Sequence, residues 1–101
     1  MIDEHTILEY TTRKYNTQCS DKAGYQTIKT ITECKSAAIA LGKPGTVDLV
    51  PIEFTIIGIP PGCFFDTRER RTYFNPAEYG KAAPQAAPIC GKQGKEKYLA
   101  M

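Results

Sequence analysis

The stretch TITECKSAAIALG, residues 30–42, carries the clearest secondary-structure signal in the chain. Thr30 can cap a helix, and Glu33 three residues later completes a capping-box pattern. Gly42 is a natural helix end, and Pro44 follows it. The sequence therefore predicts a helix over about residues 31–41. One face of it is formed by residues at helical spacing, namely Ile31, Cys34, Ala37, Ala38 and Leu41.

The residues on either side of this helix favour β-structure. Residues 47–59 are dense in β-branched side chains and predict a strand, with Pro51 indicating an edge position or an irregular start. Residues 63–65 and 72–74 predict a hairpin around a charged turn. Residues 25–28 predict a short strand, and residues 77–88 a surface loop. We therefore expect an α+β domain in which one helix packs on a small antiparallel sheet.

Four cysteines decide the class of protein: Cys19, Cys34, Cys63 and Cys90. Zinc ligands usually come in close pairs, and these cysteines are spread over the whole chain, so a zinc site is disfavoured. Four buried free thiols are an alternative, because free cysteine is a common core residue. Two disulfides are the favoured interpretation, and they indicate an oxidising compartment.

Four cysteines allow three disulfide connectivities, and sequence alone does not choose among them. A Cys34–Cys63 bond is preferred because it joins the buried helix face to the hairpin, and Cys19 and Cys90 then tie the ends of the compact region. Each bridge closes a long loop, which stabilises a protein by roughly 3–4 kcal/mol in the chain-entropy model. The expected organisation is an N-terminal arm over 1–18, a disulfide-bonded domain over 19–91 and a C-terminal tail over 92–101.

Composition excludes several partners. The formal net charge is only +2 and no basic run is interleaved with aromatics, so we expect no nucleic acid. The longest apolar stretch, 47–61, is too short and too charged to span a bilayer, so we expect no transmembrane segment. Residues 1–10 lack the apolar core of a signal peptide; with disulfides, this favours a targeting segment that was removed or a longer precursor.

The chain shows no pattern typical of catalysis. The lone His5 lies outside the expected domain, and a disulfide-bonded cysteine cannot act as a nucleophile. Asp66 and Glu69 lie in an arginine-rich turn, where solvated ion pairs explain them. We expect a protein that is not an enzyme and has neither a cofactor nor a metal site.

Two features favour binding. The segment 47–59 is either a central strand or, since it carries more apolar surface than so small a core needs, an exposed interface. The turn 68–71 displays three guanidiniums that suit carboxylates, phosphates or anionic lipid head groups, so peripheral membrane association stays open beside a merely solvated turn. The candidate partner-binding residues are Leu49, Ile52, Phe54, Ile57, Arg68, Arg70 and Arg71.

Short motifs across residues 19–91 carry a resemblance to a known group of proteins: Gly24-Tyr25, Ile28, Glu33-Cys34, Ala37-Ala38, Leu41, Pro61-Gly62-Cys63-Phe64, Tyr73-Phe74-Asn75 and Ile89-Cys90. This pattern resembles a small four-cysteine domain of exported or plastid-targeted proteins from algae such as dinoflagellates and cryptophytes. The resemblance implies an accessory subunit of a photosynthetic membrane complex on the lumenal side. Residues 47–59 depart from the pattern, because a short polar linker is expected there.

The expectation is therefore a structural or accessory subunit that binds protein neighbours in a larger assembly, an algal photosystem or light-harvesting complex facing the thylakoid lumen. The alternative is a secreted, extracellular, lectin-like module that binds its ligand through the aromatic hairpin and the turn 68–71. That hairpin contributes Phe64, Phe65, Tyr73 and Phe74. An inhibitor or toxin is a third class, because disulfide scaffolds serve all of these functions.

Overall fold

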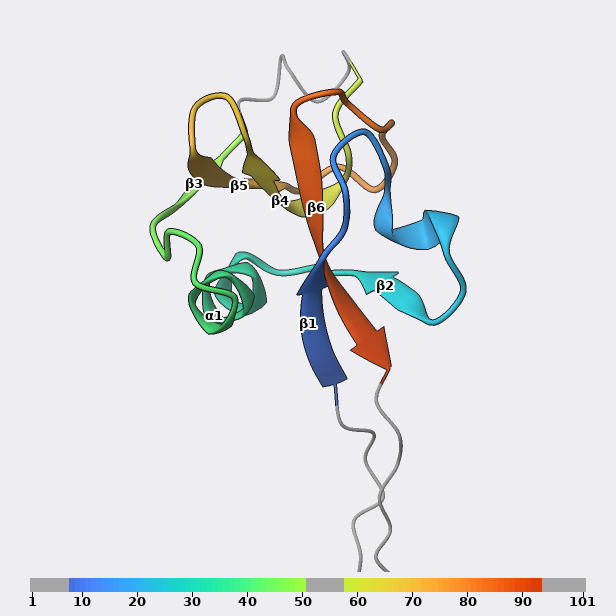
Figure 1. Cartoon of the computed structure of the whole chain (residues 1–101), viewed down its shortest axis with the longest axis horizontal. Coiled ribbons are helices and arrows are strands. Elements are labelled where there is room, and N and C mark those ends of the chain that lie inside the picture. The colour runs from blue at the N-terminus through green and yellow to red at the C-terminus, as the bar shows by residue number, and fades with distance from the viewer. Residues whose placement is uncertain (1–7, 51–57, 94–101) are drawn as a thin grey trace, which may run out of the picture.

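The structure, a computed structural model, describes residues 8–50 and 58–93 (Figure 1). Over these residues the chain forms one α-helix, one short 3₁₀ helix and six strands. In chain order they are β1 (Leu8–Thr12), η1 (Cys19–Asp21), β2 (Tyr25–Thr27), α1 (Ile31–Ala40), β3 (Val47–Leu49), β4 (Gly62–Asp66), β5 (Arg71–Asn75) and β6 (Ala86–Gln93).

The strands form one sheet in the order β1-β6-β4-β5-β3, with β2 also paired to β6. All pairs are antiparallel except β3 and β5, which run parallel with Val47 opposite Thr72. The expected α+β class is confirmed, but the sheet is mixed rather than purely antiparallel. The parallel pair arises because the chain crosses from β3 to β4 before the β4–β5 hairpin returns it in its original direction.

The helix begins and ends where the sequence predicts. The Glu33 N–H donates to the Thr30 hydroxyl over 3.1 Å, which satisfies one of the free N–H groups of the first turn. Gly42, one residue beyond the Leu41 cap, has φ +74°, a left-handed conformation that glycine adopts without strain. The buried face of α1 consists of Cys34, Ala37 and Ala38, whose small side chains let the helix approach the sheet closely.

The main core lies between α1 and the sheet, and a disulfide crosses it. Cys34 of α1 bonds to Cys63 of β4, with 5.4 Å between their Cα atoms. Cys19 of η1 bonds to Cys90 of β6, so the preferred pairing is confirmed and the described residues contain no free cysteine. The buried members of this core are Ile28, Cys34, Ala37, Ala38, Val47, Cys63, Phe74 and Ile89. Two buried disulfides are typical of a protein from an oxidising compartment.

The predicted hairpin is confirmed as β4 and β5, and the predicted strand at 25–28 as β2. The loop predicted over residues 77–88 is wrong at its end, where Ala86 starts β6 and pairs with Asp66. The alanines of this segment are small enough to be buried, and Ala83, Ala86 and Ala87 are buried. Of the strand expected over 47–59, β3 occupies only Val47–Leu49, and residues 51–57 lie outside the described residues.

A strand from the segment expected as an N-terminal arm also belongs to the sheet. β1 pairs along β6 from Leu8 opposite Gln93 to Thr12 opposite Ile89. β1 is a polar, threonine-rich strand at an edge of the sheet. Threonine is common in strands, but composition alone does not reveal which segment such a strand pairs with. Across residues 8–50 and 58–93, no helix has the length and apolar character needed to cross a membrane.

Candidate functional site

The side of the β4–β5 hairpin that faces away from α1 carries a second, smaller apolar cluster. Because side chains alternate along a strand, Cys63 and Phe74 face α1, whereas Phe64 and Tyr73 face the other side. The rings of Phe64 and Tyr73 stack with their centroids 5.6 Å apart. Residues of this cluster outside the hairpin are Val50, Ile59, Ala83 and Ala86.

A groove of about 420 Å³ lies over this second cluster and reaches the β3 edge. Its apolar lining is Leu49, Val50, Ile59, Phe64 and Tyr73, and its polar rim is Asp48, Asp66, Glu69, Arg71 and Gln85. Leu49 leaves 57% of its surface exposed at the rim. An apolar floor inside a charged rim is the composition of a protein-binding surface.

The rim is held together by charged and polar contacts. Arg71 Nη1 lies 3.0 Å from Asp48 Oδ2 between two strands, but both side chains are largely exposed, so the pair stabilises the fold by less than about 1 kcal/mol. The Tyr73 hydroxyl donates to Glu69 Oε1. This hydrogen bond, with burial as a smaller cause, raises the pKa of Tyr73 above its ordinary value, so the phenol remains neutral and can donate.

The turn between β4 and β5 is ordered by Asp66. Its Oδ1 accepts from the backbone N–H groups of Arg68 and Glu69 over 2.9 and 2.8 Å. Arg70 takes a left-handed conformation with φ +61°, and its N–H donates to the Asp66 carbonyl over 2.7 Å. The turn thus presents its exposed guanidiniums from a fixed backbone.

The structure brings together only part of the predicted partner-binding set. Leu49 and Arg71 line the groove, whereas Arg68 and Arg70 are exposed in the neighbouring turn and do not line it. Ile52, Phe54 and Ile57 lie outside the described residues. The sequence placed Ile59 in the apolar segment 47–59 and Tyr73 in the hairpin of the lectin-like alternative, but it did not bring the two together, and it missed Gln85. The strand alternation that places Tyr73 opposite Phe64 is the signal that could have assigned Tyr73 to the groove.

The aromatic hairpin does not form one exposed platform of the kind the lectin-like alternative needs. Phe64 and Phe74 are only 4% and 6% exposed, and they lie in the two different clusters on opposite faces of the sheet. Phe65, on the α1 side, is covered by Lys43, whose Nζ lies 4.6 Å from the ring centroid. Of the four, Phe64 and Tyr73 line the groove, and Tyr73 carries a hydroxyl group at the tip of its ring.

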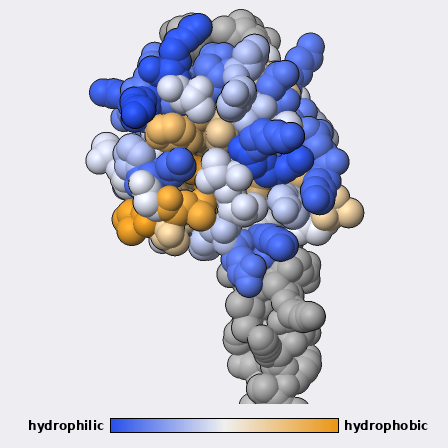
Figure 2. Space-filling model, viewed as in Figure 1, coloured by the Kyte–Doolittle hydropathy of each residue, from blue (hydrophilic) through white to orange (hydrophobic). Residues whose placement is uncertain are grey.

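Apolar surface also extends over the side of the molecule that carries α1 and β3, surrounded by hydrophilic surface (Figure 2). Ile39 of α1 is 65% exposed. Within residues 8–50 and 58–93, no group of three or more histidine, cysteine, aspartate or glutamate side chains is placed to hold a metal ion. Among the features described, the groove combines an apolar lining with charged side chains, which makes it the candidate site.

Comparison of the chain with known proteins gives no relative from which a function can be transferred. Scanning protein-family models and searching curated proteins and solved structures found no match.

Proposed function

We propose that the chain is a non-catalytic accessory subunit that binds a neighbouring protein in a larger assembly through the groove between β3, β4 and β5. The observation that carries this proposal is the composition of the groove, whose lining combines apolar side chains, among them the exposed Leu49, with three carboxylates and one guanidinium. Such a surface accepts an apolar side chain in its centre and charged groups at its edge.

The rim favours a partner with both signs of charge. Asp48, Asp66 and Glu69 offer carboxylates, and Arg71 offers a guanidinium that only partly engages Asp48. Charges at a rim contribute orientation and association rate more than affinity. The apolar centre is therefore the part of the groove whose alteration weakens binding most.

We further propose an algal photosynthetic membrane complex, a photosystem or light-harvesting complex, as the assembly, with this subunit on the lumenal side of the thylakoid. Two observations support this: the disulfides, which suit an oxidising compartment, and the resemblance of the cysteine motifs to plastid-targeted algal domains. Most of those motif residues lie in the core or at the disulfides. These residues are evidence for the photosynthetic complex only through the resemblance, because they do not form a contact surface.

The test is site-specific photo-crosslinking in the native source. A benzophenone amino acid at Leu49 is expected to capture one subunit of a large complex, and the same group at Ser36, exposed on α1, is not. Leu49→Glu is expected to release the chain from the complex, whereas Ile39→Glu, at another exposed apolar position, on α1 and outside the groove, is not.

Two results contradict the proposal. One is a native chain that purifies as a free monomer with unchanged behaviour in Leu49→Glu. The other is glycan binding by the isolated domain that is lost in Tyr73→Ala, which favours the lectin-like alternative. If the complex captured through Leu49 contains no chlorophyll, the proposal of an accessory subunit stands and the proposal of a photosynthetic complex is wrong.

A further inference from the structure

Charged side chains share the face of the sheet that carries the groove. In the β4–β5 register, Phe64 lies opposite Tyr73, and two residues along each strand Asp66 lies opposite Arg71. Asp48 of β3 lies opposite Tyr73. Paired residues, and residues two apart on a strand, point to the same side of a sheet, so these side chains all line the groove.

Carboxylates outnumber cations in the groove. Asp48, Asp66 and Glu69 line it together with the guanidinium of Arg71. That guanidinium is engaged by Asp48, so it does not neutralise the charges of Asp66 and Glu69. The lining as a whole is therefore negative, and this excess decides which sign of charge predominates on the side of the partner.

The carboxylates of Asp66 and Glu69 are also held in place. Asp66 Oδ1 accepts two backbone N–H groups of the turn, and Glu69 Oε1 accepts the Tyr73 hydroxyl. The second oxygen of each carboxylate accepts no hydrogen bond from residues 8–50 and 58–93. Two oriented acceptors therefore remain for a cationic donor, and hydrogen bonds between a cation and a carboxylate are among the strongest in proteins.

The other arginines of the β4–β5 turn do not offset this excess within the groove. Arg68 and Arg70 are exposed and do not line it. Salt at physiological concentration screens exposed charges over about 8 Å, so an occupant responds most to the charged groups that it contacts. Those groups are the charged side chains of the lining.

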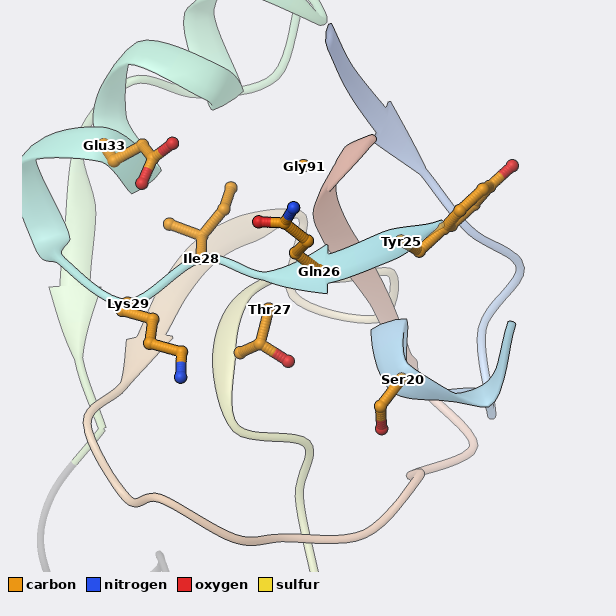
Figure 3. Close-up of a pocket in the computed structure, with 8 residues that line it drawn as sticks. All are labelled: Ser20, Tyr25, Gln26, Thr27, Ile28, Lys29, Glu33 and Gly91. Atoms are coloured by element: carbon orange, nitrogen blue, oxygen red, sulfur yellow. The ribbon is translucent and has the colours of Figure 1, made fainter. Parts of the chain in front are cut away.

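Two other hollows of the molecule lack such an excess. One, of about 500 Å³, lies beside β2, and Figure 3 shows the side chains that line it. Its charged side chains are Lys29 and Glu33, one of each sign. The other, of about 320 Å³, is lined by Lys29 and Glu78, again one of each sign. Of the three, only the groove distinguishes a basic occupant from an acidic one.

We propose that the groove binds a segment of the partner protein in which a basic side chain, lysine or arginine, stands next to an apolar one. The inference rests on the proposed function and names the chemistry of the partner that this function requires. The apolar side chain packs over Leu49 and Phe64. The cationic group donates to Asp66 and Glu69, beside the ring of Tyr73, and aromatic rings attract cations.

The test measures affinity for the complex captured by crosslinking at Leu49, which is purified without the chain and titrated with fluorescently labelled variants. Glu69→Gln keeps an oxygen that accepts from Tyr73 but removes the charge, so it is expected to weaken binding about threefold, the effect of one exposed ion pair. Glu69→Lys is expected to weaken binding about tenfold, since a repulsion replaces the attraction. Arg71→Gln removes the guanidinium of the lining and is expected to strengthen binding about threefold.

Matched controls make the same charge changes outside the groove. Glu78→Gln and Lys35→Gln, both at exposed positions, are expected to leave the affinity unchanged. If the effects of the Glu69 and Arg71 variants are absent, or if both are reversed as an acidic segment requires, the basic occupant is overturned and the proposed function stands. If crosslinking at Leu49 captures nothing, or captures a second copy of the chain, both proposals are overturned.

Discussion

The two faces of the β4–β5 hairpin differ although the same ten residues build both. On the α1 side, Cys34, Cys63 and Ile89 are at most 1% exposed, and a disulfide joins the helix to the sheet. On the opposite side the cluster is smaller and opens into a groove that ends at the exposed Leu49. Burial and the disulfide therefore concentrate stability on one face, whereas the other face stays partly open.

Removal of a disulfide is expected to have the largest effect on this arrangement. The Cys34→Ala/Cys63→Ala and Cys19→Ala/Cys90→Ala variants are each expected to lose about 4 kcal/mol of unfolding free energy, since both bridges close long loops. Chemical denaturation of each variant measures the loss. A variant in which all four cysteines are replaced shows any effect of the reductant that does not depend on disulfides. Equal Tm values of the native protein with and without strong reductant would contradict the prediction.

Truncation of a side chain on each face tests the comparison directly. Ile89 is fully buried against α1, so Ile89→Ala is expected to cost about 2–5 kcal/mol through lost burial and a cavity. Leu49→Ala, at an exposed position, is expected to change stability by no more than about 0.5 kcal/mol. Urea denaturation of the pair gives both numbers. Equal losses would show that the two faces stabilise the fold alike.

Gly62 and Gly24 both have a positive φ angle, so comparing them distinguishes the effect of close packing from that of backbone strain. Gly62 and Gly24 have φ +82° and +88°, but a Cβ at Gly62 would clash with Thr27 and Ile28, whereas a Cβ at Gly24 meets nothing within 4 Å. Gly24→Ala is expected to cost about 1 kcal/mol from strain, and Gly62→Ala at least about 2 kcal/mol. Thermal unfolding compares the Tm values of the two variants. Similar values would contradict the close packing of Gly62 against Thr27 and Ile28.

The helix cap is a smaller contribution on the closed face. Thr30→Ala removes the acceptor of the Glu33 N–H and is expected to cost about 1 kcal/mol. Thr32→Ala, at an exposed position inside α1, is expected to change stability by no more than about 0.5 kcal/mol. Denaturation midpoints of the two variants measure the cap, and a Thr32 effect as large as that of Thr30 would contradict this assignment.

The smallest expected effect is a difference between two tyrosines. Burial is the main cause that raises the pKa of Tyr10, followed by its hydrogen bond to Glu33, whereas the hydrogen bond to Glu69 is the main cause for Tyr73. Glu69→Gln is therefore expected to lower the pKa of Tyr73 more than Glu33→Gln lowers that of Tyr10, as measured by NMR titration of the ring carbons.

The raised pKa values also give a sign for the pH dependence. A neutral phenol favoured in the folded state contributes stability below pH about 10, and this contribution is lost as the pH rises through the folded pKa. The stability difference between native protein and Tyr73→Phe is expected to be constant below that pH and to shrink above it. A difference that grows with pH would contradict the assignment of a neutral phenol at Tyr73.

Local chemistry predicted much of the fold. The cap at Thr30, the face that contains Cys34 and the hairpin on either side of residues 66–71 each depend on neighbours in sequence, and the structure confirms them. The preferred disulfide pairing, which depended on where those elements place their cysteines, is also confirmed. The parallel β3–β5 pair and the incorporation of β1 were not predictable in this way, because they depend on contacts between segments that are distant in the chain.

The candidate site was less predictable for the same reason. Leu49 and Arg71 were identified by exposure and charge, but Tyr73, Ile59 and Gln85 join them only once the sheet is assembled. An aromatic pair such as Phe64 and Tyr73 has the same composition as a ligand platform. Only the position of each ring relative to the sheet distinguishes a core residue from a groove residue.

The most direct test of the account is a disulfide map of the protein from its native source, obtained by alkylation in denaturant, digestion without reductant and mass spectrometry. The account predicts no alkylated cysteine and two linked peptide pairs, Cys34 with Cys63 and Cys19 with Cys90. An alkylated Cys34 or Cys63, or a bond from either of them to Cys19 or Cys90, would contradict the claim that a disulfide closes the α1 face of the sheet.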